Sequence, residues 1–300
     1  TAPGRNQVLI QVAAVSVNPV DWKILAGEQR LFTGRKLGKE RVFGCDFAGT
    51  ILALGDGTTG LAPGMRVCGL LNPLREGSFS QFLTVPATSC LTVPDQLDDL
   101  QAAALPAAGI AAIRALYQRP LGWWRGKSVF LNGASGGVGH LLLQLLSHQG
   151  ALVWATASPD RHSGLREMGA VHTLDYRKIA SVASLTDFDA VIDCHGSLAL
   201  SHRHELFARP RGLFIPLSIA NPQIPAVVAY AAWRHLSAGP DTRLVLAAPS
   251  RPLLAELLSC CAQGSLSPRL GAVFPADQAD AAVALSRAGH AFGKIVVSLT

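Results

Sequence analysis

Residues 128–146 read SVFLNGASGGVGHLLLQLL, in which an apolar strand leads through a glycine-rich turn into a helix. The glycines of the turn stand at positions 133, 136, 137 and 139. Glycine lets the backbone approach an anion closely, and the turn's N–H groups and the positive end of the helix dipole both face that anion. Because strand, turn and helix follow one another in the required order, the stretch predicts a cradle for a pyrophosphate.

Strands and helices alternate over residues 101–264. The expected strands are continuously apolar, as in a parallel sheet that is covered on both faces. They span 128–132, 151–156, 171–174, 189–194, 211–217 and 242–247, and helices are expected near 101–117, 138–148, 159–168, 199–208 and 250–263. The alternation predicts an α/β domain of the Rossmann type, a doubly wound parallel sheet that binds a dinucleotide.

Residues 1–100 have a different character, because short strands alternate there with Gly/Pro turns. Glycine, proline and valine are abundant over 41–94, which is typical of a compact, largely antiparallel β-domain. A β-rich tail over 265–300 is expected to rejoin this domain, with strands near 272–275 and 294–298 and a helix over 276–288. The sequence therefore predicts a Rossmann domain inserted into a β-rich domain.

The composition indicates a well-buried globular protein, since 49% of the 300 residues are apolar and only 15% are charged. The net charge of +6 comes from scattered residues without a Lys/Arg block, so a phosphate-rich cofactor is expected and nucleic acid is not. Six cysteines without C-x-x-C spacing predict free thiols in a cytoplasmic protein.

No apolar run approaches the ~20 residues that cross a bilayer, so no membrane partner is expected. The chain starts at Thr1 and enters a strand pattern at once, so we expect the numbering to begin inside a longer natural sequence.

Motifs along the whole chain resemble one family. They are residues 17–23 (VNPVDWK), 44–49 (GCDFAG), 77–82 (GSFSQF), 105–112 (LPAAGIAA), the 133–139 turn, 175–177 (DYR), 188–193 (FDAVID) and 293–296 (GKIV). In this order they resemble the medium-chain dehydrogenase/reductase superfamily, in its zinc-free quinone oxidoreductase branch. The resemblance implies a GroES-like catalytic domain for residues 1–100 and 265–300, beside a Rossmann domain over 101–264.

The resemblance also bears on metal binding. In zinc-containing relatives a Cys precedes an Asp by three positions, and a Gly-His-Glu motif supplies a second ligand. Here Asn18 stands in place of that Cys, while Cys45 and Asp46 replace the His and the Glu. The four closely spaced cysteines of the structural zinc lobe are absent from the sequence. Because a catalytic zinc needs three protein ligands, no metal site is predicted.

The end of the second Rossmann strand favours NADPH. NAD-selective sites carry an acid about 20 residues beyond the glycine loop, and none stands at the end of this strand. Asp160 comes slightly later in the sequence. It is better explained as an acid in the first turn of a helix, where it complements the helix dipole and where Ser158 is expected to be the N-cap. Ser158 and Arg161 are placed to bind a 2′-phosphate, and the resemblance implies that Tyr176 reaches it too. A plain surface role is the alternative for each of these residues.

Further cofactor contacts are implied by the resemblance. His195 follows the fourth strand, where the family contacts the cofactor; a histidine exposed beside the site is the other interpretation. The remaining predicted cofactor-binding residues are Ala111, Ser135, Gly136, Gly137, Val138, Leu217, Phe292 and Lys294.

Asn18 and Trp22 are the predicted catalytic residues. By its position in the family motif Asn18 is expected near the nicotinamide and the substrate, although an Asn before a proline also suits a turn. Trp22 lines the pocket or belongs to the core. Asp21 and Lys23 form an acid/base pair, or else a structural ion pair or solvated residues. The tyrosine that many relatives carry shortly after this motif is missing, so the proton is expected from solvent or from an unassigned group.

The resemblance, together with the strand end that favours NADPH, implies an NADPH-dependent, zinc-independent reductase of quinones or other α,β-unsaturated carbonyl compounds. An enoyl-thioester reductase of secondary metabolism is one alternative. A catalytically weak NADPH-binding sensor or interaction protein is the other. The strand predicted over 242–247 would form a sheet edge, and its pairing across a two-fold axis predicts a homodimer.

Overall fold

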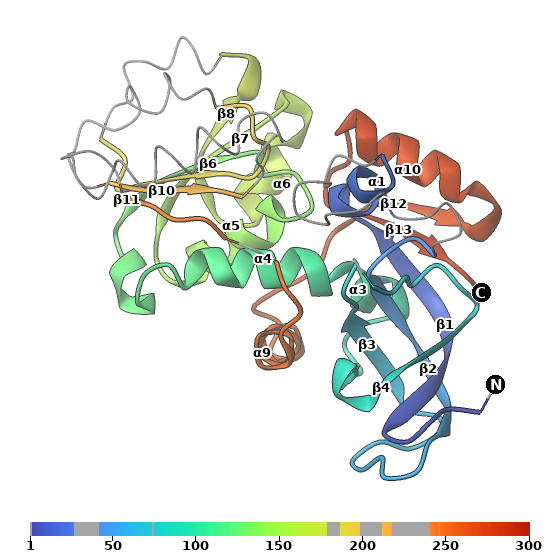
Figure 1. The fold of residues 1–300 in the computed structure, drawn as a ribbon. Coiled ribbons are helices and arrows are strands. Elements are labelled where there is room, and N and C mark those ends of the chain that lie inside the picture. The colour runs from blue at the N-terminus through green and yellow to red at the C-terminus, as the bar shows by residue number, and fades with distance from the viewer. Residues whose placement is uncertain are drawn as a thin grey trace. The chain divides into compact units, whose positions relative to one another are not determined.

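The computed structural model describes residues 2–26, 42–73, 75–178, 187–198, 212–217, 241–245 and 247–300. The chain divides into two compact units, which can be followed by colour along the chain in Figure 1. The first unit comprises Thr1–Ile110 and Ala247–Thr300, and the second comprises Ala111–Leu246. The second unit is therefore inserted into the first.

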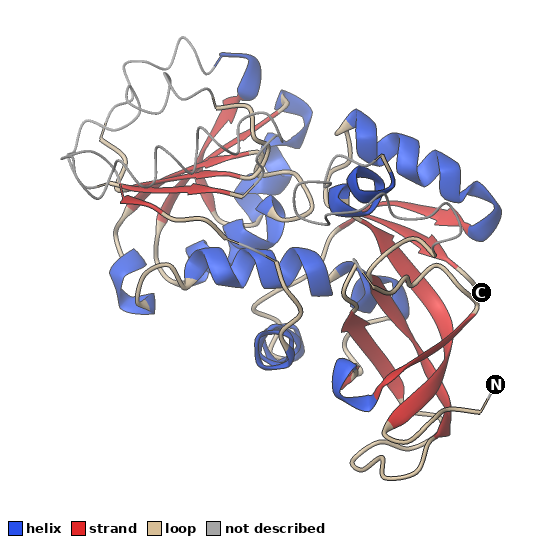
Figure 2. Cartoon of the chain, viewed as in Figure 1, coloured by secondary structure: helices blue, strands red, loops and turns tan. Residues whose placement is uncertain are grey.

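The first unit is built on a seven-stranded sheet, drawn in red in Figure 2. Its order is β12-β13-β1-β2-β3-β5, and β4 pairs with β1. The strands are β1 (Gln7–Val17), β2 (Asp46–Leu54), β3 (Arg66–Leu70), β4 (Phe82–Pro86), β5 (Leu91–Thr92), β12 (Leu270–Pro275) and β13 (Lys294–Ser298). All pairs are antiparallel except β12 with β13. Because the last strand pairs with the first, the tail rejoins the N-terminal domain as predicted.

Alternating residues of β1 supply the core of this unit. Val8, Ile10 and Val12 are buried and pack with Phe47 and Ile51 of β2. The helices of the unit are α1 (Pro19–Leu25), α3 (Asp99–Ala104), the start of α4 (Pro106–Leu116), α9 (Arg251–Ala262) and α10 (Ala279–Ala288). Short 3-10 turns cover Ala87–Ser89 and Ala276–Gln278.

The helices α3 and α9 belong to this first unit although they lie at or beyond the predicted limits of 1–100 and 265–300. The reason is packing, since α3 lies against β1 and β2, and α9 lies against β5. The predicted helix over 101–117 is two helices, because Pro106 has no N–H to continue the first one.

The second unit holds a six-stranded, wholly parallel sheet in the order β11-β10-β9-β6-β7-β8. Its strands are β6 (Ser128–Asn132), β7 (Leu152–Ala157), β8 (Ala170–Asp175), β9 (Ala190–Asp193), β10 (Leu213–Pro216) and β11 (Asp241–Thr242). Counted from β6, the order is 3-2-1-4-5-6, which is that of a Rossmann sheet. The described helices include α5 (Gly139–His148) and α6 (His162–Glu167), with 3-10 turns at Leu121–Trp124 and Pro159–Arg161. The predicted fold class is confirmed.

Several predicted elements differ in extent. In place of the strand predicted over 242–247, the structure forms the two-residue strand β11, and residues 243–245 carry no strand structure. The helix over 159–168 begins as a 3-10 turn. The predicted helix over 199–208 lies outside the described residues. The homodimer stays a prediction, and β11, the edge strand through which it was expected to form, is shorter than expected.

Within the part of the chain that the structure describes, no helix has the length and apolar character needed to span a membrane. All six cysteines are free thiols, as predicted.

We expect Gly139→Ala to destabilise the second unit, whereas Gly122→Ala should not. A Cβ on Gly139 would stand 2.3 Å from the Gly133 carbonyl oxygen, while a Cβ on Gly122 would meet nothing within 4 Å. Overpacking of this kind costs about 1–3 kcal/mol. Chemical denaturation of both variants measures the free energy of unfolding, and equal values for the two would contradict this packing.

Candidate functional site

The glycine-rich turn between β6 and α5 has the shape that its sequence predicts. Gly133 adopts a positive φ of 73°, and its N–H donates to Thr156 Oγ1 at 3.0 Å. Gly139 packs directly on the turn, which is why no Cβ fits there. A Cβ on Gly136 would meet only the Gly133 carbonyl oxygen, at 3.3 Å, so there is open space beside Gly136. No side chain caps the start of α5. The turn therefore fits a phosphate group, which its backbone would hold.

Arg161 follows β7 and contacts the glycine turn. Its Nη1 donates to Ser135 Oγ at 3.1 Å, and its Nε lies 3.7 Å from the Asp160 carboxylate. The strand before it, β7, ends at Ala157 without an acidic residue. A guanidinium held beside the phosphate cradle is suited to a second phosphate, because it presents several donors in a fixed geometry.

Ser158 differs from its prediction in one respect. It occupies the N-cap position of the turn Pro159–Arg161, but its side chain makes no capping hydrogen bond. Its hydroxyl bonds to Asp160 instead, and this bond is the main reason that the pKa of Asp160 is lowered. The predicted cap is therefore wrong, because the nearby carboxylate competes for the hydroxyl.

Tyr176 follows β8 and is exposed. The Arg177 guanidinium lies 5.9 Å from its ring centroid and donates to both carboxylate oxygens of Asp175. This hydrogen bonding lowers the pKa of Asp175. The end of β8 thus presents an exposed aromatic ring with an arginine beside it.

His195 follows the carboxyl end of β9, and Leu217 follows the carboxyl end of β10. A Cβ on Gly133 would stand 3.0 Å from His195 Cβ, so the histidine loop packs against the turn. The Leu217 N–H donates to the Asp193 carbonyl at 2.9 Å. In the second unit the structure therefore brings the turn residues Ser135–Val138 together with Arg161 and His195.

A separate polar cluster occupies the first unit. Asp46, at the start of β2, is fully buried. Its Oδ2 accepts from Ser16 Oγ at 2.5 Å and from Asn18 Nδ2 at 2.8 Å, and its Oδ1 accepts from the Ala107 N–H at 2.8 Å.

Lys294 completes this cluster from β13. Its Nζ donates to Asn18 Oδ1 at 2.6 Å and lies 3.8 Å from Asp46 Oδ2. The side-chain amide of Asn18 is thus held at both ends, by an ammonium and by a carboxylate. Lys294 is only 3% exposed. Because a buried charge is costly unless it is paired, its ammonium must be compensated by groups inside the protein.

Asp21 stands beside the cluster and is buried, which its sequence position did not reveal. Its Oδ2 accepts from the Asn18 N–H at 2.8 Å, and the pair forms a capping box at the start of α1. Burial, and then the negative charge of Asp46, raise the pKa of Asp21 to about 7. Instead of pairing with Asp21, Lys23 lies 5.6 Å from the Trp22 ring centroid.

Trp22 faces the helix α10. Its indole N–H donates to Ser286 Oγ at 3.2 Å, and the ring packs on the core of the first unit. These contacts favour the core interpretation of Trp22. Phe292 is half-buried with the Arg269 guanidinium 4.3 Å from its ring centroid, and Ala111 is buried in α4.

The positions that hold zinc in the zinc-containing relatives do not fit a zinc ion in this chain. Asn18 offers an amide that is already bonded to Lys294, and Asp46 faces that ammonium. Burial and the carboxylates of Asp46 and Asp21 raise the pKa of the Cys45 thiol well above its usual value, which disfavours the thiolate that a metal needs. Among the described residues no group of three or more His, Cys, Asp or Glu side chains is arranged for a metal.

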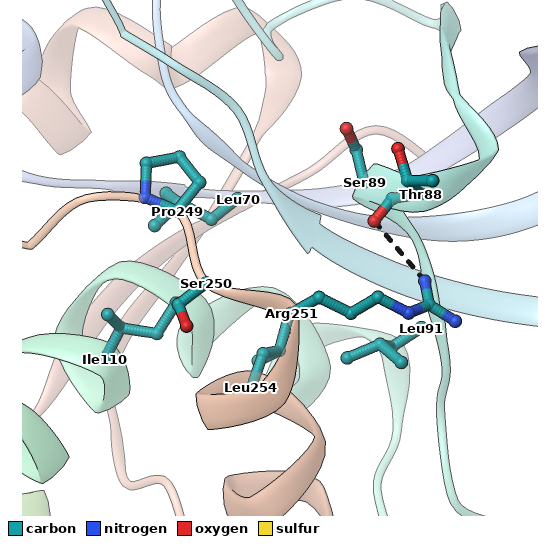
Figure 3. A pocket seen from close by; sticks show the side chains of 9 residues that line it. All are labelled: Leu70, Thr88, Ser89, Leu91, Ile110, Pro249, Ser250, Arg251 and Leu254. Carbon is teal, nitrogen blue, oxygen red and sulfur yellow. Dashed lines mark hydrogen bonds between the residues drawn. The ribbon is translucent and has the colours of Figure 1, made fainter.

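A cavity of about 170 Å³ lies elsewhere in the first unit (Figure 3). It is lined by Leu70, Thr88, Ser89, Leu91, Ile110, Pro249, Ser250, Arg251 and Leu254. The Arg251 guanidinium spans one side and donates to the Thr88 carbonyl at 3.3 Å, the bond dashed in Figure 3. None of the predicted catalytic or cofactor-binding residues lines it.

Two family models match separate stretches of the chain, and the second stretch includes parts of both units. Residues 4–95 match the alcohol dehydrogenase GroES-like domain, and residues 168–297 match a family described as zinc-binding dehydrogenase. A chloroplast envelope quinone oxidoreductase homolog of Arabidopsis thaliana is 31% identical over 309 residues, which cover 98% of this chain and 90% of that protein. The mitochondrial NAD(P)H oxidoreductase RTN4IP1 of Mus musculus is 28% identical over 327 residues, which cover 98% and 82%.

Among solved structures, the quinone oxidoreductase of Coxiella burnetii superposes with a TM-score of 0.84 at 26% identity, covering 100% of this chain and 93% of that one. A Rossmann unit inserted into a GroES-like unit is the architecture of a two-domain dehydrogenase or reductase. The chain belongs to the medium-chain dehydrogenase/reductase superfamily, in which it is quinone oxidoreductase-like. It is accordingly an oxidoreductase that uses a nicotinamide cofactor.

We expect stability to fall as pH rises through the titration of Asp21. The pKa of Asp21 is about 7 in the folded chain, against an ordinary value of 3.8. Between these two pH values the folded chain binds more protons than the unfolded chain, so the free energy of unfolding falls as pH rises. The loss is on the order of 2–4 kcal/mol between pH 4 and pH 8. Asp21→Asn mimics the neutral acid and should flatten this dependence in thermal melts across that range.

The control is Asp98→Asn, which changes an exposed carboxylate in the capping box of α3. It should leave the pH dependence as in the unchanged protein. A steep dependence that persists in Asp21→Asn would contradict the assignment of the proton to Asp21.

Proposed function

We propose that the chain is an NADPH-dependent, zinc-independent reductase of quinones or other α,β-unsaturated carbonyl compounds, acting in the cytoplasm. The observation that carries the cofactor choice is the Arg161–Ser135 hydrogen bond on the glycine turn, next to a strand end without an acid. A carboxylate there would accept from the ribose hydroxyls of NAD and repel a 2′-phosphate. The class of substrate is supported by the quinone oxidoreductases to which the chain is similar.

The second unit supplies the residues that would hold the cofactor. The backbone of Ser135, Gly136, Gly137 and Val138 would bind the pyrophosphate, because it lies at the start of α5. Arg161, with Ser158 and Tyr176, would take the 2′-phosphate. Such a charged contact is stronger than a neutral hydrogen bond, and it discriminates between the two nicotinamide dinucleotides.

The first unit would supply the polar groups for the substrate. The cofactor provides hydride chemistry when bound, so the protein's task is to orient the reactants and exclude water. Asn18 is the proposed catalytic residue of this unit, and Lys294 and Asp46 fix its amide before any ligand binds. The same ammonium compensates the Asp46 carboxylate without a metal ion. Solvent would deliver the proton to the product.

Arg161→Ala should weaken NADPH binding by about 10-fold or more, because hydrogen bonds to charged groups contribute roughly 1.5–3 kcal/mol. NADH binding should hardly change, since NADH has no 2′-phosphate. Titration of both cofactors by calorimetry measures the two affinities. Arg166→Ala is the matched control, because Arg166 lies further along the same segment and bonds to Thr173. Equal losses for NADPH and NADH would overturn the assignment of Arg161.

Turnover separates the proposed reductase from its alternatives. We expect the protein to oxidise NADPH, followed at 340 nm, with at least one quinone or enone. Enoyl thioesters in the same panel identify the enoyl-reductase alternative if they alone are reduced. Tight NADPH binding without turnover on any acceptor would contradict the proposal and leave an NADPH-binding sensor.

A further inference from the structure

Three neighbouring strands of the second unit are joined at their carboxyl ends by buried polar side chains. Asn132 ends β6, Thr156 lies near the end of β7 and Asp193 ends β9. Asn132 and Asp193 are direct register partners across the two parallel strands. All three side chains are at most 1% exposed. Polar groups buried in this way must satisfy one another, so their hydrogen bonds fix their relative positions.

The carboxylate of Asp193 is enclosed by N–H donors. Its Oδ1 accepts from Asn132 Nδ2 at 2.8 Å, from the His195 N–H at 3.1 Å and from the Gly196 N–H at 2.8 Å. Its Oδ2 accepts from the Leu198 N–H at 3.1 Å. The backbone of residues 195–198 therefore wraps around one buried carboxylate, with Gly196 at a positive φ of 83°.

Asn132 connects this loop to the glycine turn. Its Oδ1 accepts from Thr156 Oγ1 at 2.8 Å, and that hydroxyl accepts in turn from the Gly133 N–H at 3.0 Å. Its Nδ2 also donates to Ser197 Oγ at 3.0 Å. The hydrogen bonds run in one direction, from Gly133 through Thr156 and Asn132 to Asp193. Rotating the amide of Asn132 would place donors where acceptors are needed.

The network lies where the order of the parallel sheet reverses. The strands β7 and β8 lie on one side of β6, while β9, β10 and β11 lie on the other. Ligands of such sheets bind outside the carboxyl ends of the strands at this point. The glycine turn and the 195–198 loop are the two segments that flank it, and His195 already packs against Gly133.

We propose that Asp193, Asn132 and Thr156 are positioning residues for the cofactor, which hold the glycine turn and the 195–198 loop in one fixed arrangement. The inference rests on the proposed function, because NADPH is the ligand that both segments would contact. None of the three side chains needs to touch the cofactor. They act by keeping the backbone donors of the two segments in place before binding, which lowers the ordering cost of binding.

The opposite ends of the same two strands provide a matched control. Ser128 begins β6, and its Oγ donates to Asp189 Oδ2 at 3.1 Å, just before β9. The Ser128 N–H donates to the same oxygen at 3.0 Å. This pair links the strands with similar hydrogen bonds but lies away from the glycine turn. Ser128→Ala therefore reports what the loss of such a link does to stability alone.

Thr156→Val tests the proposal most cleanly, because valine keeps the shape and removes the hydroxyl between Gly133 and Asn132. We expect the Kd for NADPH to rise about 10-fold in Thr156→Val, with kcat at saturating NADPH within about 2-fold of the unchanged protein. Thr156→Ser restores the hydroxyl and should restore the Kd. Ser128→Ala should lower the Tm without changing the Kd.

Hydrogen exchange supplies a readout that needs no turnover. In Thr156→Val, amide exchange should accelerate both in residues 133–139 and in residues 194–198, whereas in Ser128→Ala it should not. An unchanged Kd in Thr156→Val, or an equal rise in Ser128→Ala, overturns the inference. If the unchanged protein binds no NADPH, the proposed function fails; the exchange of the two segments then still decides whether Thr156 links them.

Discussion

The buried carboxylate of Asp46 is the constraint on which the first unit depends. A charge in the interior must be compensated, and here the compensation comes from segments that are far apart in the sequence. Ser16 lies on β1, Asn18 is the N-cap of α1, Ala107 lies in the first turn of α4 and Lys294 begins β13. Because one carboxylate gathers all of them, the N-terminal strand, the central helix and the C-terminal tail meet at one place. That place is also where the family motif positions Asn18.

The second unit is organised around a comparable group. Asp193 is as buried as Asp46, but its hydrogen-bond partners are N–H donors of one loop and of Asn132. The two carboxylates therefore do different work. Asp46, with an ammonium 3.8 Å away, holds side chains that we propose for the chemistry, whereas Asp193 holds backbone donors that we propose for cofactor binding. In each unit the candidate functional residues are thus held by a buried acid.

Local sequence was sufficient where local chemistry decides the structure. The strand 128–132 and the glycine turn follow from their own residues, and β6 spans Ser128–Asn132 as predicted. The roles of Asp21 and Asp193 were missed, because burial and partners depend on tertiary packing. A polar residue that ends an apolar strand, such as Asp193, is the signal that was available. Ser158 failed as a cap because a neighbouring carboxylate takes its hydroxyl, a competition that the pattern does not weigh.

In the proposed NADPH-dependent enzyme, Lys294 rather than a metal ion compensates the charge of Asp46. Native mass spectrometry tests this directly. The protein is dialysed against a buffer that contains zinc and is then mixed with NADPH. We expect one NADPH per chain and no retained zinc. One zinc ion per chain, lost to a chelator together with turnover, would contradict it.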